Sequence, residues 1–311
     1  MKRELLAPSL VPKVFEFHDA DEFRSSIRNV DVDFTPLVSK ISARQMILEL
    51  PGCSVNFTSA FPRILDVQLN PSCTAVGFSM DDGVPVRFNG VERDHLAIVL
   101  GSGGAACSTV ARTSRQFAAI IFTPEITDRG WPQTDHHFKM FETSRPAFHW
   151  LRSLVREVMS ISAFSTLDDA NEISFAIRES LLAGIDAAFA DVVAARWASY
   201  ANSARQFRIF QDIRALLAGN VATPIYSEEL AQKVGVSVRT LHDTVLRYRG
   251  MSLHRYLRLR RLWLVRRRLL LGAQSVKACA LAFGFWHLGD FSRSYRSQFG
   301  ESPSETLARS R

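Results

Sequence analysis

The stretch from Ser227 to Arg311 decides the fold of this chain, because one short pattern occurs in it twice. In the first copy, Leu230-Ala231 is followed, after three further residues, by Gly235-Val236-Ser237. In the second copy, Cys279-Ala280 stands in the same relation to Gly284-Phe285. A small alanine lets two helix backbones approach closely, and a glycine takes the turn that residues with a Cβ resist. Each copy therefore predicts two helices that cross at a steep angle.

An arginine-rich segment joins the two copies, whose glycines, Gly235 and Gly284, lie 49 residues apart (284 − 235). We predict that this segment is a helix from about Ser252 to Leu271. The second helix of the first copy should begin at Ser237, whose hydroxyl is placed to cap it. The residues expected on the buried faces of the two second helices are Leu241, Val245, Phe291, Tyr295 and Phe299.

This tail resembles the double helix-turn-helix domain of AraC/XylS-family transcription regulators. The residues that carry the resemblance are Leu230-Ala231, Gly235-Val236-Ser237, Thr240-Leu241, Gly250-Met251-Ser252, Tyr256-Leu257, Arg261-Leu262, Val276, Ala280, Gly284-Phe285, Phe291, Phe299-Gly300 and Ser302-Pro303. Within the family, Arg239-Thr240-Leu241 and the stretch Gly284 to Gly289 look most like regulators of ethanolamine-utilisation operons. The chain departs from the family pattern at Val245, Leu253 and Leu307. The resemblance implies a module that binds double-stranded DNA.

In a helix-turn-helix, the second helix lies in the major groove with its early residues facing base edges. Arg239 suits the O6 and N7 atoms of guanine, and Asp243 can accept a hydrogen bond from cytosine N4. An ion pair from Asp243 to Arg239 or Arg247 is the alternative for that carboxylate. The DNA-binding candidates on this helix are Ser237, Val238, Arg239, His242, Asp243 and Arg247.

The second recognition helix and the joining helix supply further candidates. Arg293 matches a position that often contacts DNA in the resembling family, and Leu288 either touches a thymine methyl or completes the core. Arginines of the joining helix can neutralise phosphates, which makes affinity fall steeply with salt. The remaining DNA-binding candidates are His287, Leu288, Gly289, Asp290, Arg293 and Arg296 on the recognition helix, with Arg258 and Arg261 on the joining helix.

Charge is divided unevenly along the 311 residues, which carry a formal net charge of +7. Residues 1–204 hold 19 Lys and Arg against 24 Asp and Glu, a net charge of −5. Residues 205–311 hold 19 against 7, a net charge of +12. A basic module joined to a mildly acidic one indicates that only the tail meets a polyanion.

The first part of the chain, from Val14 to about Glu125, has the signals of strands. Turn residues separate short apolar runs, and Asn89-Gly90 is the clearest hairpin, because a type I′ turn needs positive φ at both central residues. The runs are Met46–Leu50, Ile64–Leu69, Ala75–Met80, Leu96–Leu100 and Phe117–Phe122. We expect a β sandwich or barrel that resembles the jelly-roll-like sensor domain of AraC/XylS relatives. The predicted fold class is α+β.

Two long helices should follow the strands. Ser144 with Pro146 opens the first, and the second should span about Asp169 to Tyr200. They suit dimerisation or packing against their own β domain. Ala201 to Arg205 is the predicted linker, with a helix from Gln206. The predicted division is residues 1–143 for effector sensing, 144–200 for dimerisation or packing, and 205–311 for DNA binding.

Several other features favour an ordinary globular protein of the cytoplasm. The four cysteines have no metal-ligand spacing, and no apolar run is long enough to span a membrane. Asp135-His136-His137 suggests a metal only weakly, because adjacent histidine side chains diverge. The glycines of residues 101–104 lie between two strand-like runs, which favours a hairpin turn over a phosphate cradle.

The predicted function is a sequence-specific transcription regulator, with activation as the family's commoner mode. The partners expected are promoter DNA, a small-molecule effector such as an amine or amino acid, a second copy of the chain and RNA polymerase, with no membrane. We expect no catalytic residue, metal or cofactor, and the effector-binding residues stay unknown. The alternatives are a metal-dependent cupin enzyme with an accessory helical domain, and a non-specific nucleic-acid-binding protein.

Overall fold

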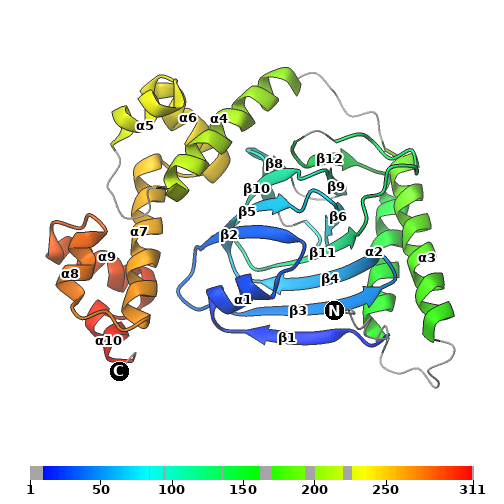
Figure 1. Cartoon of the computed structure of the whole chain (residues 1–311), viewed down its shortest axis with the longest axis horizontal. Helices are drawn as coiled ribbons and strands as arrows, with labels where there is room; N and C mark the ends of the chain where they lie inside the picture. The colour runs from blue at the N-terminus through cyan, green and yellow to red at the C-terminus, as the bar shows by residue number, and fades with distance from the viewer. Residues whose placement is uncertain are drawn as a thin grey trace, which may run out of the picture. The chain divides into compact units, whose positions relative to one another are not determined.

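The computed structural model describes residues 10–83, 85–93, 96–134, 136–161, 170–192, 200–219 and 226–309. The chain divides into two compact units (Figure 1). The second contains the residues from 198 onward together with two short segments of the strand region, Phe34–Lys40 and Arg87–Val91, and the first contains the other residues before 198. Strands and two long helices build the first unit, and helices build the second, which confirms the α+β class.

A seven-stranded sheet forms the larger layer of the first unit, and every neighbouring pair in it is antiparallel. In spatial order its strands are β1 (Lys13–Phe17), β3 (Ala43–Leu50), β4 (Cys53–Ala60), β11 (Arg115–Phe122), β6 (Thr74–Ser79), β9 (Ala97–Ser102) and β12 (Lys139–Glu142). The central strand β11 lies between β4 and β6, so residues distant in sequence meet at the middle of the sheet.

A five-stranded sheet forms the other layer. In spatial order its strands are β2 (Val30–Pro36), β5 (Arg63–Leu69), β10 (Ala106–Ala111), β7 (Val86–Phe88) and β8 (Val91–Arg93). The predicted hairpin turn between the last two is confirmed, since Asn89 and Gly90 have φ values of 44° and 81°. Both values lie in the left-handed region that a type I′ turn requires.

Helices α2 (Arg145–Ser160) and α3 (Ala170–Ala190) lie side by side against the seven-stranded sheet (Figure 1). Ser144 caps α2 as predicted, because its hydroxyl accepts a hydrogen bond from the Ala147 backbone N–H. Phe148 and Val155 belong to one core with residues of the sheet. The two helices thus pack against the β-sheet of their own chain.

The prediction for the second of these helices was too long. Helix α3 ends at Ala190, and of the predicted remainder residues 193–199 lie outside the described part. The end of α3 is fixed by polar contacts: the Thr143 hydroxyl donates to the Ala188 carbonyl at 2.7 Å, and the Ser144 hydroxyl donates to Asp191 at 2.6 Å. A short helix that was not predicted, α1 (Ala20–Ser26), is capped by Asp19.

Seven helices form the described part of the second unit from residue 200 onward. They are α4 (Tyr200–Gly219), α5 (Ser227–Val234), α6 (Val238–Arg249), α7 (Leu253–Leu270), α8 (Val276–Ala282), α9 (Leu288–Phe299) and α10 (Pro303–Ala308). The predicted linker Ala201 to Arg205 is wrong, because α4 already begins at Tyr200. The sequence Ala-Asn-Ser-Ala-Arg has no Gly or Pro to interrupt a helix, so the cooperative propagation of α4 runs through it.

Other predictions concern the cysteines, a candidate metal site and membrane-spanning segments. All four cysteines are buried free thiols. Asp135 and His95 lie outside the described residues; the backbone of His136 accepts from Ala106, and His137 forms a bridge to that strand. Within the described part, no group of three His, Cys, Asp or Glu could hold a metal ion. No described helix is long and apolar enough to cross a membrane.

Candidate nucleic-acid interface

The two predicted turns have the same geometry. After α5, the Gly235 N–H donates to the Gln232 carbonyl at 3.1 Å, and the Val236 N–H donates to the Ala231 carbonyl at 3.0 Å. After α8, the corresponding bonds run from Gly284 to Leu281 and from Phe285 to Ala280, both at 3.0 Å. Gly235 and Gly284 adopt φ values of 73° and 75°. The sequence repeat is therefore also a structural repeat of two helix-turn-helix motifs.

The first recognition helix, α6, begins as predicted at Ser237. The Ser237 hydroxyl accepts from the Thr240 N–H at 3.1 Å, so it caps the helix. Leu241 and Val245 are buried, as predicted, beneath the outward face. This packing turns Val238 and its neighbours outward.

The outward face of α6 carries an exposed pair of opposite charges. The side chain of Arg239 is 92% exposed and that of Asp243 is 70% exposed, with 3.8 Å between Arg239 Nε and Asp243 Oδ2. An ion pair this exposed contributes little to stability, so the guanidinium can reach another partner at small cost. His242 is half-buried beside this pair. The structure therefore contains the Arg239–Asp243 ion pair that was the predicted alternative to a contact between Asp243 and cytosine. Arg239 nevertheless stays accessible to solvent.

Arg247, near the end of α6, makes a different contact. Its Nη1 donates to Gln206 Oε1 of α4, which ties the recognition helix to the preceding helix. Sequence spacing could not reveal this bond, because the two residues are 41 positions apart.

The second recognition helix, α9, also presents an arginine beside an aspartate. Arg293 is 81% exposed and donates from Nη2 to Asp290 Oδ1 one turn earlier. The hydrogen bond and charge of Arg293 lower the pKa of Asp290, which keeps it ionised. Arg296, 66% exposed, lies 3.7 Å from Glu305 of α10. As on α6, an exposed guanidinium projects from the outward face.

At the start of α9, two of the candidate DNA-binding residues, His287 and Gly289, are exposed, whereas Leu288 packs against the core. His287 occupies the N-cap position with an exposed side chain that makes no capping hydrogen bond. Gly289 is exposed, and a methyl group added to it would meet no atom within 4 Å. Leu288 packs against the core around Phe291 and Tyr295, so it completes the core of the motif.

The two candidate arginines of α7 also support the second motif. Arg258 donates from Nη2 to the Ser294 hydroxyl of α9. The guanidinium carbon of Arg261 lies 5.4 Å from the centroid of the Phe285 ring, and burial, with the charge of Arg258, lowers the pKa of Arg261. Both side chains therefore brace the motif through contacts that sequence analysis did not anticipate.

Sequence analysis missed one exposed aromatic residue at this surface. Trp286 is 68% exposed, directly before the N-cap of α9. The sequence feature that could have indicated this exposure is the position of Trp286 in the turn before α9, outside the buried stripe of Phe291, Tyr295 and Phe299.

Comparisons with known proteins agree with this geometry. The sequence family described as "Helix-turn-helix domain" matches residues 230–309. The chain is 36% identical over 103 residues to the XylDLEGF operon transcriptional activator 3 of Pseudomonas putida, which covers 32% of this chain and 31% of that protein. It is 33% identical over 96 residues to the HTH-type transcriptional activator RhaS of Pectobacterium carotovorum, covering 30% and 34%.

Among solved structures, a probable AraC family transcriptional regulator from Rhodopseudomonas palustris is 37% identical, with 33% of this chain and 98% of that chain covered and a TM-score of 0.32. Residues 230–309 form an AraC/XylS-type helix-turn-helix domain. The chain spans about a third of the length of the two curated relatives named above. All three proteins are described as transcriptional regulators or activators.

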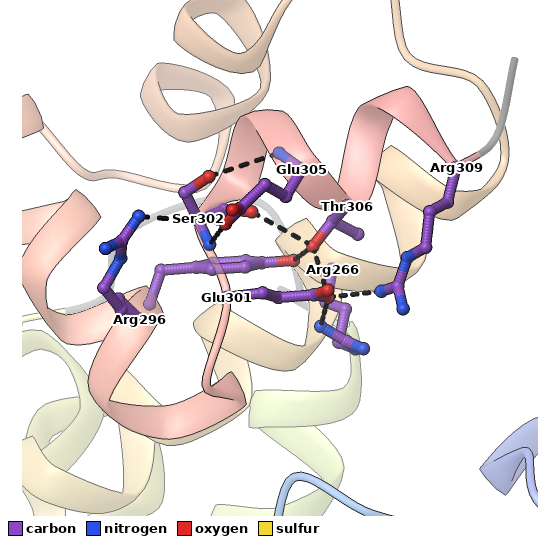
Figure 2. A network of polar contacts seen from close by, with 8 residues as sticks. Arg266, Arg296, Glu301, Ser302, Glu305, Thr306 and Arg309 are labelled. Carbon is purple, nitrogen blue, oxygen red and sulfur yellow. Dashed lines mark hydrogen bonds and ion pairs between the residues drawn. The ribbon is translucent and has the colours of Figure 1, made fainter.

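In this AraC/XylS-type domain, a polar network holds the second motif together (Figure 2). Glu301 accepts from Arg266 Nη1 at 2.6 Å, from the Thr306 hydroxyl at 2.7 Å and from Arg309. The Tyr295 hydroxyl of α9 donates to Thr306 at 2.9 Å. The Glu301 carboxylate thus connects α7 with α10 directly, and it connects to α9 through the Thr306 hydroxyl.

A buried arginine has the same function in the first motif. Arg249 is 1% exposed, and its guanidinium carbon lies 4.6 Å from the Phe210 ring centroid and 4.7 Å from that of Tyr256. Tyr248 stacks on Phe210 at 4.3 Å. These contacts join α4, α6 and α7, so the AraC/XylS-type domain continues into α4, which precedes the matched residues.

Proposed function

We propose that this chain is a one-component transcription regulator, in which the helical unit binds promoter DNA and the β-rich unit responds to a small-molecule effector. One observation carries the proposal: two matching helix-turn-helix motifs each present an exposed arginine, Arg239 and Arg293, from the outward face of the recognition helix. Guanidinium groups bind the O6 and N7 atoms of guanine in the major groove. The domain's relatives named above support activation of transcription as the outcome.

In this proposal the two arginines read bases, and the remaining candidates position the helices. His242 and Asp243 flank Arg239, and His287 and Gly289 lie at the start of α9, where a helix meets base edges. Arg258 and Arg247 hold the motifs through Ser294 and Gln206 and add positive charge near the phosphates. The net charge of +12 over residues 205–311 favours association with a polyanion.

The first unit supplies sensing and self-association in this proposal. Residues 1–143 bind the effector, and residues 144–200 contribute to a homodimer. Trp150 on α2 is 48% exposed and Phe175 on α3 is 53% exposed, and these two side chains are the candidate contacts of that homodimer. Contact with RNA polymerase and a cytoplasmic location complete the proposed mode of action.

The subgroup is a finer proposal. The residues Arg239-Thr240-Leu241 and Gly284 to Gly289 favour a regulator related to those of ethanolamine-utilisation operons, with a nitrogenous effector. The relatives named above carry other names, those of the XylDLEGF operon activator and RhaS. Identification of the bound promoter would decide between these subgroups, because its neighbouring genes indicate the metabolite.

In vitro selection from random DNA duplexes, with the full-length chain, tests the function. We expect a motif of two short blocks about one helical turn apart. Arg239→Ala should weaken selection in one block and Arg293→Ala in the other. Arg208→Ala, at an exposed position of α4 outside both motifs, is the matched control and should leave selection of both sequence blocks unchanged. Selection of no motif, or equal affinity for unrelated duplexes, would refute sequence-specific regulation and favour the non-specific alternative.

A further inference from the structure

The turn before the second recognition helix is one residue longer than the turn before the first. In the first motif, the N-cap Ser237 lies two positions after Gly235 (237 − 235 = 2). In the second motif, the N-cap His287 lies three positions after Gly284 (287 − 284 = 3). The backbone hydrogen bonds of each glycine and of the residue that follows it are equivalent in the two turns. The additional residue is therefore Trp286, which stands directly before the N-cap.

The buried faces of the two recognition helices place this extra residue before the helix. Leu241 is the first buried residue of α6 and lies four positions after its N-cap (241 − 237 = 4). Phe291 is the first buried residue of α9 and also lies four positions after its N-cap (291 − 287 = 4). The longer turn thus leaves the buried face of α9 equivalent to that of α6.

The side chain of Trp286 takes no part in the core of the motif. The residue directly before an N-cap often packs against the fourth residue of the helix, which here is Phe291. Phe285 makes this contact instead, with 4.9 Å between its ring centroid and that of Phe291. Within the described part of the chain, Trp286 forms no hydrogen bond and no ring contact, and it is 68% exposed. The fold therefore does not account for a tryptophan at this position.

The neighbouring positions at the start of α9 present little apolar surface. Leu288 packs against the core, and Gly289 has no side chain, with nothing within 4 Å of an added Cβ. The imidazole of His287 and the carboxylate of Asp290 are exposed and polar. Trp286 thus supplies a large apolar group beside polar ones at the end of the helix that is expected to meet DNA.

The major groove offers one apolar group among its hydrogen-bonding atoms. Thymine presents a C5-methyl beside its O4 acceptor, whereas the pattern of the other three bases consists of donors and acceptors. In a helix-turn-helix, the N-terminal end of the recognition helix contacts base edges, and Trp286 lies at that end of α9. The face of an indole ring can cover a methyl group and exclude water from it, which is favourable without any hydrogen bond.

We propose that Trp286 is a specificity-determining residue that contacts the C5-methyl group of a thymine in the operator block bound by α9. This inference rests on the proposed function, because it requires sequence-specific binding of DNA. Arg293 then reads a guanine through its guanidinium group, and Trp286 reads a thymine through its apolar ring. The longer turn gives the second motif a base preference that has no counterpart in the first. Burial of one methyl group against the ring strengthens binding about fourfold.

Deoxyuracil in place of thymine tests this contact, because it removes the methyl group and keeps every hydrogen-bonding atom. The protein is the full-length chain, and the duplex is the operator obtained by selection. The block bound by α9 is the one whose selection is weakened by Arg293→Ala, and each of its thymines is replaced in turn. We expect one replacement to reduce the affinity of the original chain about fourfold, measured by fluorescence anisotropy. In Trp286→Ala the same replacement should cause no further loss.

Two other variants show whether the methyl effect belongs to the indole ring. Trp286→Phe keeps an aromatic face and should retain most of the effect. Tyr226→Ala removes an aromatic side chain that is 72% exposed at the N-cap of α5, and it should leave the effect at full size. Because Trp286 is exposed, Trp286→Ala should have a Tm close to that of the original chain.

Three results obtained with a selected operator would overturn the proposal. The first is a block without any selected thymine, and the second is a loss on deoxyuracil replacement that is equal in the original chain and in Trp286→Ala. The third is a loss of affinity in Trp286→Ala that is equal on the operator and on a scrambled duplex, which would place the indole at the sugar-phosphate backbone. Each would leave the proposed regulator intact and remove only the thymine contact. Selection of no motif would remove the proposed function and this inference together.

Discussion

Arg239 and Asp243 face each other across one turn of α6, with 3.8 Å between Nε and Oδ2 and both side chains largely exposed. Because the pair is weak, Arg239 can leave Asp243 for a guanine without loss of fold stability. We expect Arg239→Ala to reduce the affinity for the selected operator by about 1–3 kcal/mol, measured by fluorescence anisotropy, and to leave Tm unchanged.

The base preference of Arg239 gives this prediction its control. Against a scrambled duplex, Arg239→Ala should change affinity far less than against the operator, because a base contact carries sequence information and a phosphate contact does not. Equal losses on both duplexes would show that Arg239 binds the backbone.

Substitutions of Arg258 and of Ser294 can separate the effect of the Arg258 charge on DNA binding from the effect of the Arg258–Ser294 hydrogen bond. Removal of one phosphate contact reduces the slope of log K against log salt by about 0.9. We expect this reduction for Arg258→Ala. Ser294→Ala removes the partner of Arg258 but keeps the charge, so its salt dependence should equal that of the original chain. If the slope of log K against log salt were the same for Arg258→Ala and Ser294→Ala, Arg258 would act only through its hydrogen bond to Ser294.

Glu301 predicts a pH dependence for the helical unit. Burial raises the pKa of Glu301, but hydrogen bonds from Thr306 and Arg266 and the charges of Arg266 and Arg309 outweigh it and hold the pKa below its ordinary value of 4.5. A lowered carboxylate pKa means stabilisation that is complete above the unfolded pKa and disappears as pH falls through the folded one. We expect Tm to be level near neutral pH and to fall below about pH 4.5.

The corresponding variant is Glu301→Gln. It removes hydrogen bonds to charged groups, so it should reduce the free energy of unfolding by about 1.5–3 kcal/mol at pH 7 and flatten the acid limb of the Tm profile. Glu228→Gln, at an exposed position in the first turn of α5, is the control: it removes only an interaction with the helix dipole, so it should reduce the free energy of unfolding by less than about 1 kcal/mol and leave the acid limb unchanged. An unchanged acid limb in Glu301→Gln would assign the pH dependence to other carboxylates.

Two glycines of the motifs should respond in opposite directions to the same substitution. Gly235 has a φ of 73° and nothing within 4 Å of an added Cβ, so Gly235→Ala should cost about 1–2 kcal/mol through the backbone alone. Gly289 lies inside α9 and is equally open, so Gly289→Ala should stabilise by about 0.5–1 kcal/mol. Urea unfolding measures both. A loss of operator affinity in Gly289→Ala would place that position at the DNA.

The elements that depend on neighbouring residues were the ones that sequence predicted best. The Ser144 and Ser237 caps, the Asn89-Gly90 turn and the two motif glycines each follow from chemistry within a few residues. The order of β4, β11 and β6 does not, because it depends on pairing between segments that are far apart in the sequence, such as Ala60 with Arg115 (115 − 60 = 55). Local propensity contains no such information.

The candidate DNA surface shows the same division. Helical spacing correctly predicted that Arg239 and Arg293 are exposed. It could not predict the hydrogen bonds of Arg247 to Gln206 and of Arg258 to Ser294. Those partners lie 41 and 36 residues away. The predicted linker also failed for a local reason: a short polar run without Gly or Pro has no feature that ends a helix.

Helix α4 has a mechanical consequence. It continues for 20 residues without interruption, a rod of about 30 Å at 1.5 Å per residue, and Arg249 and Tyr248 lock Phe210 in its second half to the first recognition helix. A torque applied to the first turn of such a rod is transmitted to the recognition helix, where a flexible tether would dissipate it. In the proposed regulator, small rotations at Tyr200 would thereby change the orientation of α6, the helix that carries Arg239.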